Sequence, residues 1–211
     1  MITSKNITRH EGQVGEDERA ELLGQRGAVV WLTGLSAAGK STIAYALERR
    51  LVSSGHAAFV LDGDNVRHGL CADLGFSPRD RDENIRRVGY ASALFAEAGV
   101  IAIAAFISPY RAGREGARQA VGASRFIEVF LDVPVEVCER RDPKGLYRRA
   151  RAGEIPEFTG VSAPYERPAA PEMMLDTNTL GVEDCVERIV RHLATRGFLG
   201  QRLRQELAGG R

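Results

Sequence analysis

The 211-residue sequence predicts an α/β fold with three layers, in which a parallel sheet lies between helices on both of its faces. Short apolar runs alternate along the chain with longer segments in which apolar residues recur at helical spacing. The run at 100–106 is apolar at every position, which is typical of a strand that is covered on both faces. The length fits a single domain with one substantial core.

The chain opens with a polar stretch, 1–26, which predicts an extended arm followed by a short helix. We expect the domain itself over 27–197, with a helical turn at 66–70. The tail at 198–211 has weak periodicity, which predicts a loose helix or disorder. The expected strands are 28–32, 57–61, 100–106, 126–131 and 173–176, and the expected helices are 42–53, 82–99, 112–121, 134–140 and 182–194.

The longer helices are predicted from the spacing of their apolar residues. In 42–53 the residues Ile43, Leu47 and Leu51 share one face, and Gly55 supplies a stop signal. The helix at 82–99 has the same pattern, and Ser77 is a candidate cap before it. By contrast, 142–171 is irregular, and a long irregular insert in a compact domain is often a binding loop. We therefore expect a lid loop over about 144–168.

Composition excludes several classes of function. A net charge of +1 gives no overall field that would favour nucleic acid or an anionic membrane as partner. The three cysteines, Cys71, Cys138 and Cys185, lie far apart without C-x-x-C spacing, so we interpret them as reduced thiols. The N-terminus lacks the apolar core of a signal peptide, and no apolar run approaches the roughly 20 residues that span a bilayer. We therefore expect a cytoplasmic protein.

A phosphate loop follows the first strand. The segment 34–41, GLSAAGKS, satisfies G-x-x-x-x-G-K-[ST] in the strand-loop-helix context that the motif requires. The helix that opens there directs backbone N–H groups and its positive dipole end at a polyphosphate. Lys40 is expected to neutralise the β and γ phosphates, and Ser41 to ligate Mg²⁺. The residues expected to bind ATP are Gly34, Leu35, Ser36, Ala37, Ala38, Gly39, Lys40, Ser41, Thr42 and Arg141.

Further polar residues come where the other strands end, the edge at which parallel sheets bind ligands. Asp62 and Asp64 follow the second strand and can supply a carboxylate near the metal and a proton acceptor for a phosphoryl acceptor hydroxyl. The alternative is that either residue only caps the following helix. Arginines then recur from Arg67 to Arg87, with Phe76 among them. Arginine forks suit phosphate or sulfate and an aromatic ring suits a base, so an anionic nucleotide fits as acceptor; a solvated basic helix face is the alternative.

Together these residues resemble the adenylylsulfate kinase family from about residue 6 to residue 199. Beyond the phosphate loop, the resemblance rests on six blocks. They are LDGDNVRHGL at 61–70, LGFS at 74–77, ENIRR at 83–87, FISPYR at 106–111, RDPKGLY at 141–147 and FTG at 158–160. One departure is Ala37-Ala38, which stand where glycine and serine are frequent.

The resemblance implies a fold of phosphate-loop kinase type and transfer of the γ-phosphoryl of ATP to the 3'-hydroxyl of adenosine 5'-phosphosulfate, with Mg²⁺ held by Ser41 and Asp62. It implies that Asp64 lies near the 3'-hydroxyl, and it carries over Ser108, often assigned as a phosphorylated intermediate, although in-line transfer needs no such carrier. It also implies a homodimer and a functional link to ATP sulfurylase. The implied catalytic residues are Lys40, Asp62, Asp64 and Ser108, and the implied acceptor-binding residues are Arg67, Phe76, Arg81, Asn84, Ile107, Lys144 and Phe158.

Two alternatives stay open at the level of sequence. One is a phosphate-loop kinase for another small nucleotide or sugar acid, against which the paired phenylalanine blocks favour a nucleobase. The other is a nucleotide-binding regulator without catalysis. The sequence lacks the Asn/Thr-Lys-x-Asp motif that reads guanine, which disfavours a switch protein.

Overall fold

A sheet of five parallel strands forms the centre of the computed structural model, which describes residues 7, 8, 10, 12–201, 203, 205 and 207. The strands are β1 (Ala28–Thr33), β2 (Ala58–Asp62), β3 (Ile101–Ala105), β4 (Phe126–Leu131) and β5 (Met173–Leu175). Their order in the sheet is β2-β3-β1-β4-β5. Because all pairs are parallel, the carboxyl ends of the strands meet at one edge of the sheet.

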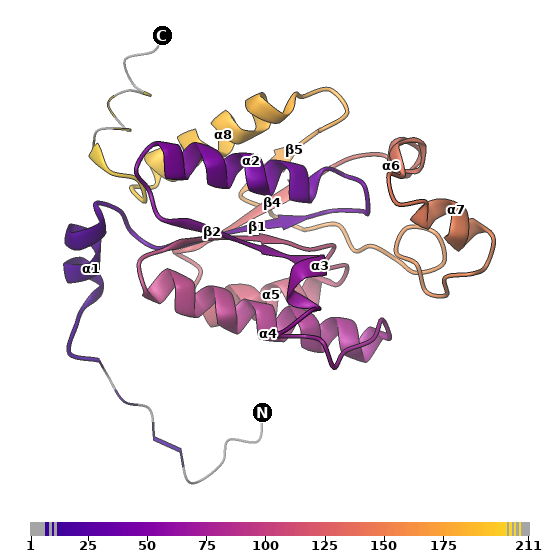
Figure 1. Cartoon of the computed structure of the whole chain (residues 1–211), viewed down its shortest axis with the longest axis horizontal. Helices are drawn as coiled ribbons and strands as arrows, with labels where there is room; N and C mark the ends of the chain where they lie inside the picture. Colours follow the sequence, from indigo (N-terminus) through magenta and orange to yellow (C-terminus); the bar gives the residue numbers. More distant parts are fainter. Residues whose placement is uncertain are drawn as a thin grey trace.

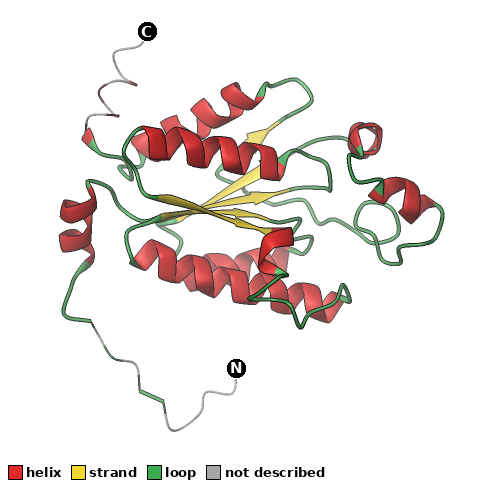
Figure 2. Cartoon of the chain, in the orientation of Figure 1, coloured by secondary structure: helices red, strands yellow, loops and turns green. Residues whose placement is uncertain are grey.

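Helices cover both faces of this sheet (Figures 1 and 2). Figure 1 shows α2 and α8 above the sheet and α4 and α5 below it, while α6 and α7 lie beyond the carboxyl ends of the strands. This confirms the predicted three-layer α/β fold. The helices are α1 (Glu16–Leu23), α2 (Lys40–Ser53), α3 (Gly63–Val66), α4 (Pro78–Glu97), α5 (Arg111–Val121), α6 (Val135–Arg141), α7 (Leu146–Arg151) and α8 (Val182–Thr195).

The central strand β1 is covered on both faces of the sheet, which accounts for its apolar sequence. All six of its residues are buried, and it is paired with β3 on one side and β4 on the other. The Trp31 ring lies between two phenylalanines, with ring centroids 5.8 Å from Phe106 and 5.7 Å from Phe126. Burial of this strand fixes the position of its carboxyl end, from which the phosphate loop starts.

Three elements differ from the sequence expectation. The helical turn expected at 66–70 begins earlier, as α3, because the Asp62 side chain accepts a hydrogen bond from the Asp64 N–H and caps it. The helix expected from residue 82 begins at Pro78, because the Ser77 hydroxyl caps it. The segment that we expected to be irregular contains α7, whose residues Tyr147 and Ala150 are buried.

Described residues of both the arm and the tail contact the domain. The Gln25 side chain, at the end of the arm, donates hydrogen bonds to the carbonyls of Ala57 and Gly99. In the predicted tail, Phe198, Leu199 and Leu203 are buried in the core. The expectations for residues 1–6, 9, 11, 202, 204, 206 and 208–211 lie outside the described residues.

Candidate active site

The phosphate loop curls tightly between β1 and α2. Three of its residues have positive φ, namely Gly34 at 152°, Ala37 at 58° and Gly39 at 98°. A Cβ at Gly34 would lie 2.9 Å from the Leu131 carbonyl oxygen, so the sheet leaves no room for a side chain there. Ala37 adopts a left-handed conformation that is uncommon for a residue with a side chain. This is the position where the family frequently has glycine.

Lys40 folds back over the loop. Its Nζ donates to the carbonyl oxygens of Gly34 at 2.9 Å and Leu35 at 2.6 Å, and 9% of the residue is exposed. Burial lowers the pKa of Lys40 to about 8, an effect that the nearby Asp62 and Asp64 carboxylates partly oppose. The ammonium group therefore lies where a polyphosphate on the loop would meet it.

The Asp62 carboxylate accepts two hydrogen bonds, one from the helix that it caps and one from the phosphate loop segment. Its Oδ1 accepts the hydrogen bond that caps α3, and its Oδ2 accepts one from the Ser41 hydroxyl at 2.7 Å. A hydroxyl and a carboxylate are oxygen ligands of the kind that Mg²⁺ prefers, usually with waters and substrate phosphates. Among the described residues no group of three or more His, Cys, Asp and Glu side chains could hold a metal ion. The Ser41 hydroxyl and the Asp62 carboxylate therefore lie side by side as oxygen atoms of the kind that could hold a divalent cation.

Asp64 lies two residues after Asp62 and contacts the lid, the segment 144–168. Its carboxylate forms an ion pair with the Lys144 ammonium, which raises the pKa of Lys144. Both side chains are exposed, Asp64 by 68% and Lys144 by 62%. The candidate base and a candidate acceptor ligand are therefore in contact across the mouth of the site.

Arg67 and Phe76 form a second group on the acceptor side. The Arg67 guanidinium carbon lies 4.3 Å from the centroid of the Phe76 ring, within the range of a cation–π interaction. Its Nη1 also donates to the carbonyls of Leu74 and Gly75, and partial burial lowers the pKa of Arg67. The Phe76 residue is 66% exposed. An exposed ring beside a cation suits stacking on a base with an anionic substituent.

Arg81 connects this group to the lid. Its Nε donates to the Phe76 carbonyl at 2.8 Å, and its two terminal nitrogens donate to Thr159 Oγ1 and the Glu157 carbonyl, each at 2.6 Å. Three of the five N–H groups of this guanidinium are thus bonded to protein. The predicted role of Arg81 in holding phosphosulfate stays a prediction. One turn along α4, Asn84 is 4% exposed and lies beside the buried Cys71 thiol, and its Nδ2 donates to no oxygen or nitrogen atom of the described residues. A buried donor of this kind costs free energy until an acceptor satisfies it.

The two phenylalanines expected to bind the acceptor differ in their surroundings. Phe158 is 8% exposed and belongs to the main core, with its ring edge-on to Tyr147 at a centroid distance of 5.0 Å. Phe158 therefore stabilises the lid from inside, and of these two rings only Phe76 is exposed. Another expected acceptor ligand, Ile107, is half-buried, and its carbonyl accepts a hydrogen bond from the Thr33 hydroxyl.

Ser108 is buried in a chain of hydroxyl groups. It is 2% exposed, and its Oγ donates to Thr33 Oγ1 at 2.9 Å and accepts from Trp31 Nε1 at 3.1 Å. The Tyr165 hydroxyl of the lid joins the same chain, 2.8 Å from Thr33 Oγ1. Burial raises the pKa of Tyr165 to about 12, so this group stays protonated. These contacts favour a structural role for Ser108.

Arg141 and two residues that the sequence reasoning missed brace the phosphate loop. Arg141 donates to both oxygens of Thr177, at 3.0 Å to Oγ1 and 2.7 Å to the carbonyl. Thr177 Oγ1 in turn donates to the Ala38 carbonyl, and the Tyr147 hydroxyl donates to the Ser36 carbonyl at 3.1 Å. Thr177 lies two residues beyond the end of β5, so the rule that ligands bind at the carboxyl ends of strands would have indicated it. Tyr147 is the last residue of the family block at 141–147, but nothing in the sequence predicted its contact with the loop.

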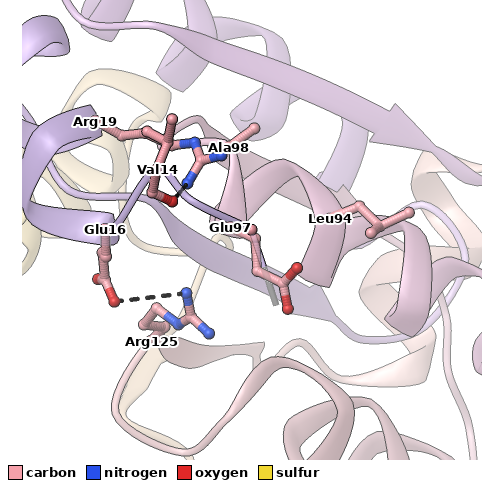
Figure 3. Close-up of a pocket in the computed structure, with 8 residues that line it drawn as sticks. Val14, Glu16, Arg19, Leu94, Glu97, Ala98 and Arg125 are labelled. Carbon is pink, nitrogen blue, oxygen red and sulfur yellow. Dashed lines mark hydrogen bonds and ion pairs between the residues drawn. The ribbon is translucent and has the colours of Figure 1, made fainter. Parts of the chain in front are cut away.

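A separate hollow lies between α1 and the end of α4 (Figure 3). Its lining mixes charges, with Glu16 3.9 Å from Arg125 in an ion pair. The neighbouring strands β3 and β4 begin here, so this hollow is at the opposite edge of the sheet from the phosphate loop. We assign it no part in the chemistry. In the described part of the chain, no helix is long and apolar enough to cross a membrane.

Comparisons with known proteins match most of the chain to one enzyme family. Residues 26–176 match the family model for adenylylsulphate kinase. The chain is 50% identical over 199 residues to an adenylyl-sulfate kinase of Staphylococcus epidermidis, an alignment that covers 94% of this chain and 100% of that protein. It is 53% identical over 194 residues to an adenylyl-sulfate kinase of Marinobacter nauticus, covering 92% of this chain and 98% of the relative.

Solved structures give the same result. The APS kinase of Mycobacterium tuberculosis in complex with AMPPNP and APS is 48% identical, with a TM-score of 0.75 over 79% of this chain and 96% of that one. A gluconokinase of Sinorhizobium meliloti is 17% identical, with a TM-score of 0.54 over 81% of this chain and 93% of that one. The second likeness is one of fold alone.

Proposed function

The chain belongs to the adenylylsulfate kinase family, and we propose that the site at the carboxyl ends of its strands is where it transfers the γ-phosphoryl group of ATP to the 3'-hydroxyl of adenosine 5'-phosphosulfate. The products are 3'-phosphoadenylylsulfate and ADP, in sulfate assimilation. One observation carries the assignment of the site. An unbroken series of contacts runs from Ser41 through Asp62 and Asp64 to Lys144. These contacts join the phosphate loop to the lid, and each of them involves the carboxylate of Asp62 or Asp64.

The transfer needs little covalent chemistry from the protein. The acceptor oxygen forms a bond to the γ phosphorus as the bond from that phosphorus to the β-γ bridging oxygen breaks, and ADP leaves. Asp64 accepts the proton of the 3'-hydroxyl, and Lys40 stabilises the charge that moves onto the phosphate oxygens. Ser41 and Asp62 would hold Mg²⁺, which would neutralise charge on the β and γ phosphates. The loop residues 34–42 and Arg141, which braces them, position ATP.

The acceptor lies between α4 and the lid. Arg67 and Phe76 receive the base and its anionic substituent, and Asn84 donates its free N–H to an acceptor oxygen. Lys144 places a positive charge beside Asp64, and Ile107 lines the same pocket. Arg81 and Phe158 hold the lid over the bound nucleotide. We propose that Ser108 acts by supporting β1 and the lid through Trp31, Thr33 and Tyr165, without a covalent intermediate.

We further propose a homodimer in the cytoplasm that works beside an ATP sulfurylase, the enzyme that makes its acceptor. Family membership supports these proposals. Light scattering on the purified chain checks the dimer, for which the expected mass is twice 23.0 kDa.

ADP release from ATP, measured with and without adenylylsulfate, tests the function. We expect release to depend on adenylylsulfate and to stay near background with AMP or gluconate as acceptor. Equal release with gluconate would assign the chain to a sugar-acid kinase, and ATP binding without any transfer would make it a regulator.

A further inference from the structure

The lid rests on the phosphate loop at two points. The Tyr147 hydroxyl donates to the Ser36 carbonyl, and a Cβ at Gly160 would lie 2.9 Å from Leu35 Cδ2, so the lid backbone touches the Leu35 side chain. Leu35 and Ser36 are both loop residues that a polyphosphate would touch. A change in the loop on ATP binding therefore reaches the lid directly.

The same lid residues hold the acceptor side. The Tyr147 ring packs edge-on against Phe158, and the next residue, Thr159, receives the hydrogen bond from Arg81. Tyr147 itself is 2% exposed, and its hydroxyl also contacts the buried Cys138 thiol. Burial raises the pKa of Tyr147, so its hydroxyl remains a donor at any working pH. Tyr147 is thus bonded to the ATP side at one end and packed on the acceptor side at the other.

We propose that Tyr147 is a positioning residue that couples the two substrate sites, so that ATP on the phosphate loop strengthens the binding of adenylylsulfate. The physical basis is the position of Lys40, whose Nζ donates to the carbonyls of Gly34 and Leu35. To reach the phosphates, this ammonium leaves at least one of those carbonyls, and the adjoining Ser36 peptide reorients with it. Tyr147 follows the Ser36 carbonyl and moves Phe158 and Thr159 against the acceptor. This inference rests on the proposed function.

The test is a calorimetric titration of the full chain with adenylylsulfate, with and without saturating Mg²⁺ and AMPPNP. For the wild type we expect AMPPNP to lower the Kd of adenylylsulfate by at least about fivefold, the lower end of typical couplings between sites. Tyr147→Phe removes the hydroxyl and keeps the ring against Phe158, so the ratio of the two Kd values should fall to within about twofold of one. Tyr165→Phe is the matched control, because its hydroxyl bonds to Thr33 in β1 and not to the loop.

The outcomes separate the inference from the function. A wild-type ratio of one, an unchanged ratio in Tyr147→Phe, or an equal loss in Tyr165→Phe would overturn the role of Tyr147. A wild-type chain that binds AMPPNP but never adenylylsulfate would instead overturn the proposed function. If Tyr147→Phe does not fold, Leu35→Ala opens the second contact with the lid. That variant should lower the ratio by at least about twofold, and an unchanged ratio there also overturns the proposal.

Discussion

The Ser41 hydroxyl lies 2.7 Å from Oδ2 of Asp62, so the first turn of α2 is bonded to the last residue of β2. This hydrogen bond connects the end of the phosphate loop to the carboxyl end of β2 and places two oxygen atoms side by side. Asp62 is only 7% exposed, so water has little access to its carboxylate, and a protein donor or a bound cation must satisfy the charge.

The first prediction concerns this pair. Asp62→Asn keeps the shape of the side chain and removes its charge, so it should weaken ATP binding in Mg²⁺ by at least about tenfold, equivalent to about 1.4 kcal/mol. Binding in EDTA should change little. Fluorescence titration with a labelled ATP analogue measures both constants. Asp17→Asn, on the exposed arm, is the control, and an equal loss in EDTA would exclude a metal ligand.

The second prediction uses the lowered pKa of Lys40. Burial favours the neutral amine, so the free protein loses this charge as the pH rises through about 8. Because the phosphates need the ammonium form, kcat/KM for ATP should fall above that pH. Lys40→Arg, which keeps its charge, should lack this basic limb even if its turnover is low. A wild-type profile that stays flat to pH 9.5 would contradict the assignment. Lys40→Ala should lower kcat by at least about a hundredfold at neutral pH.

The third prediction assigns the base. Asp64→Asn can still accept a hydrogen bond from Lys144 but cannot take a proton, so kcat should fall by at least about a hundredfold. ATP binding should be largely intact. Asp73→Asn, an exposed carboxylate on a nearby loop, is the control for charge alone. Turnover near the wild-type value in Asp64→Asn would rule Asp64 out as base.

The fourth prediction distinguishes support from covalent catalysis at Ser108. Ser108→Ala leaves the buried Trp31 N–H without its acceptor, which should cost about 1–3 kcal/mol of stability in a denaturant titration. Well below the melting temperature, kcat should remain within about fivefold of wild type, because direct in-line transfer needs no carrier. Loss of all turnover in a folded Ser108→Ala variant would support a phosphoserine instead.

The fifth prediction concerns the link between α4 and the lid. Lysine reproduces one of the three hydrogen bonds of Arg81, and each bond of a charged donor contributes about 1.5–3 kcal/mol. Arg81→Lys should therefore raise the KM for adenylylsulfate by at least about tenfold and leave the KM for ATP nearly unchanged. Steady-state kinetics measures both. Arg79→Lys changes an exposed neighbour as control, and parallel increases in both KM values would place Arg81 outside the acceptor site.

The sequence by itself determined the fold class, the phosphate loop and the carboxylates beside it. These are local features, because the loop residues are contiguous and strand ends bring Asp62 and Asp64 to a known edge of the sheet. It likewise predicted the cap at Ser77, which depends on residues within one turn. The family blocks then identified the acceptor residues as a set, without their contacts.

Only the tertiary structure decided which partner each of these residues has. Tyr147 and Ser36 are 111 positions apart, and Arg81 and Thr159 are 78 apart, so neither pairing follows from any spacing in the sequence. Phe158 lies outside α7 but packs edge-on against Tyr147 of that helix, and its burial depends on this contact with the core. Contacts between distant segments depend on the packing of the whole core, and that is the physical reason why the bonds from Arg81 to Thr159 and to the Glu157 carbonyl could not be predicted from the sequence.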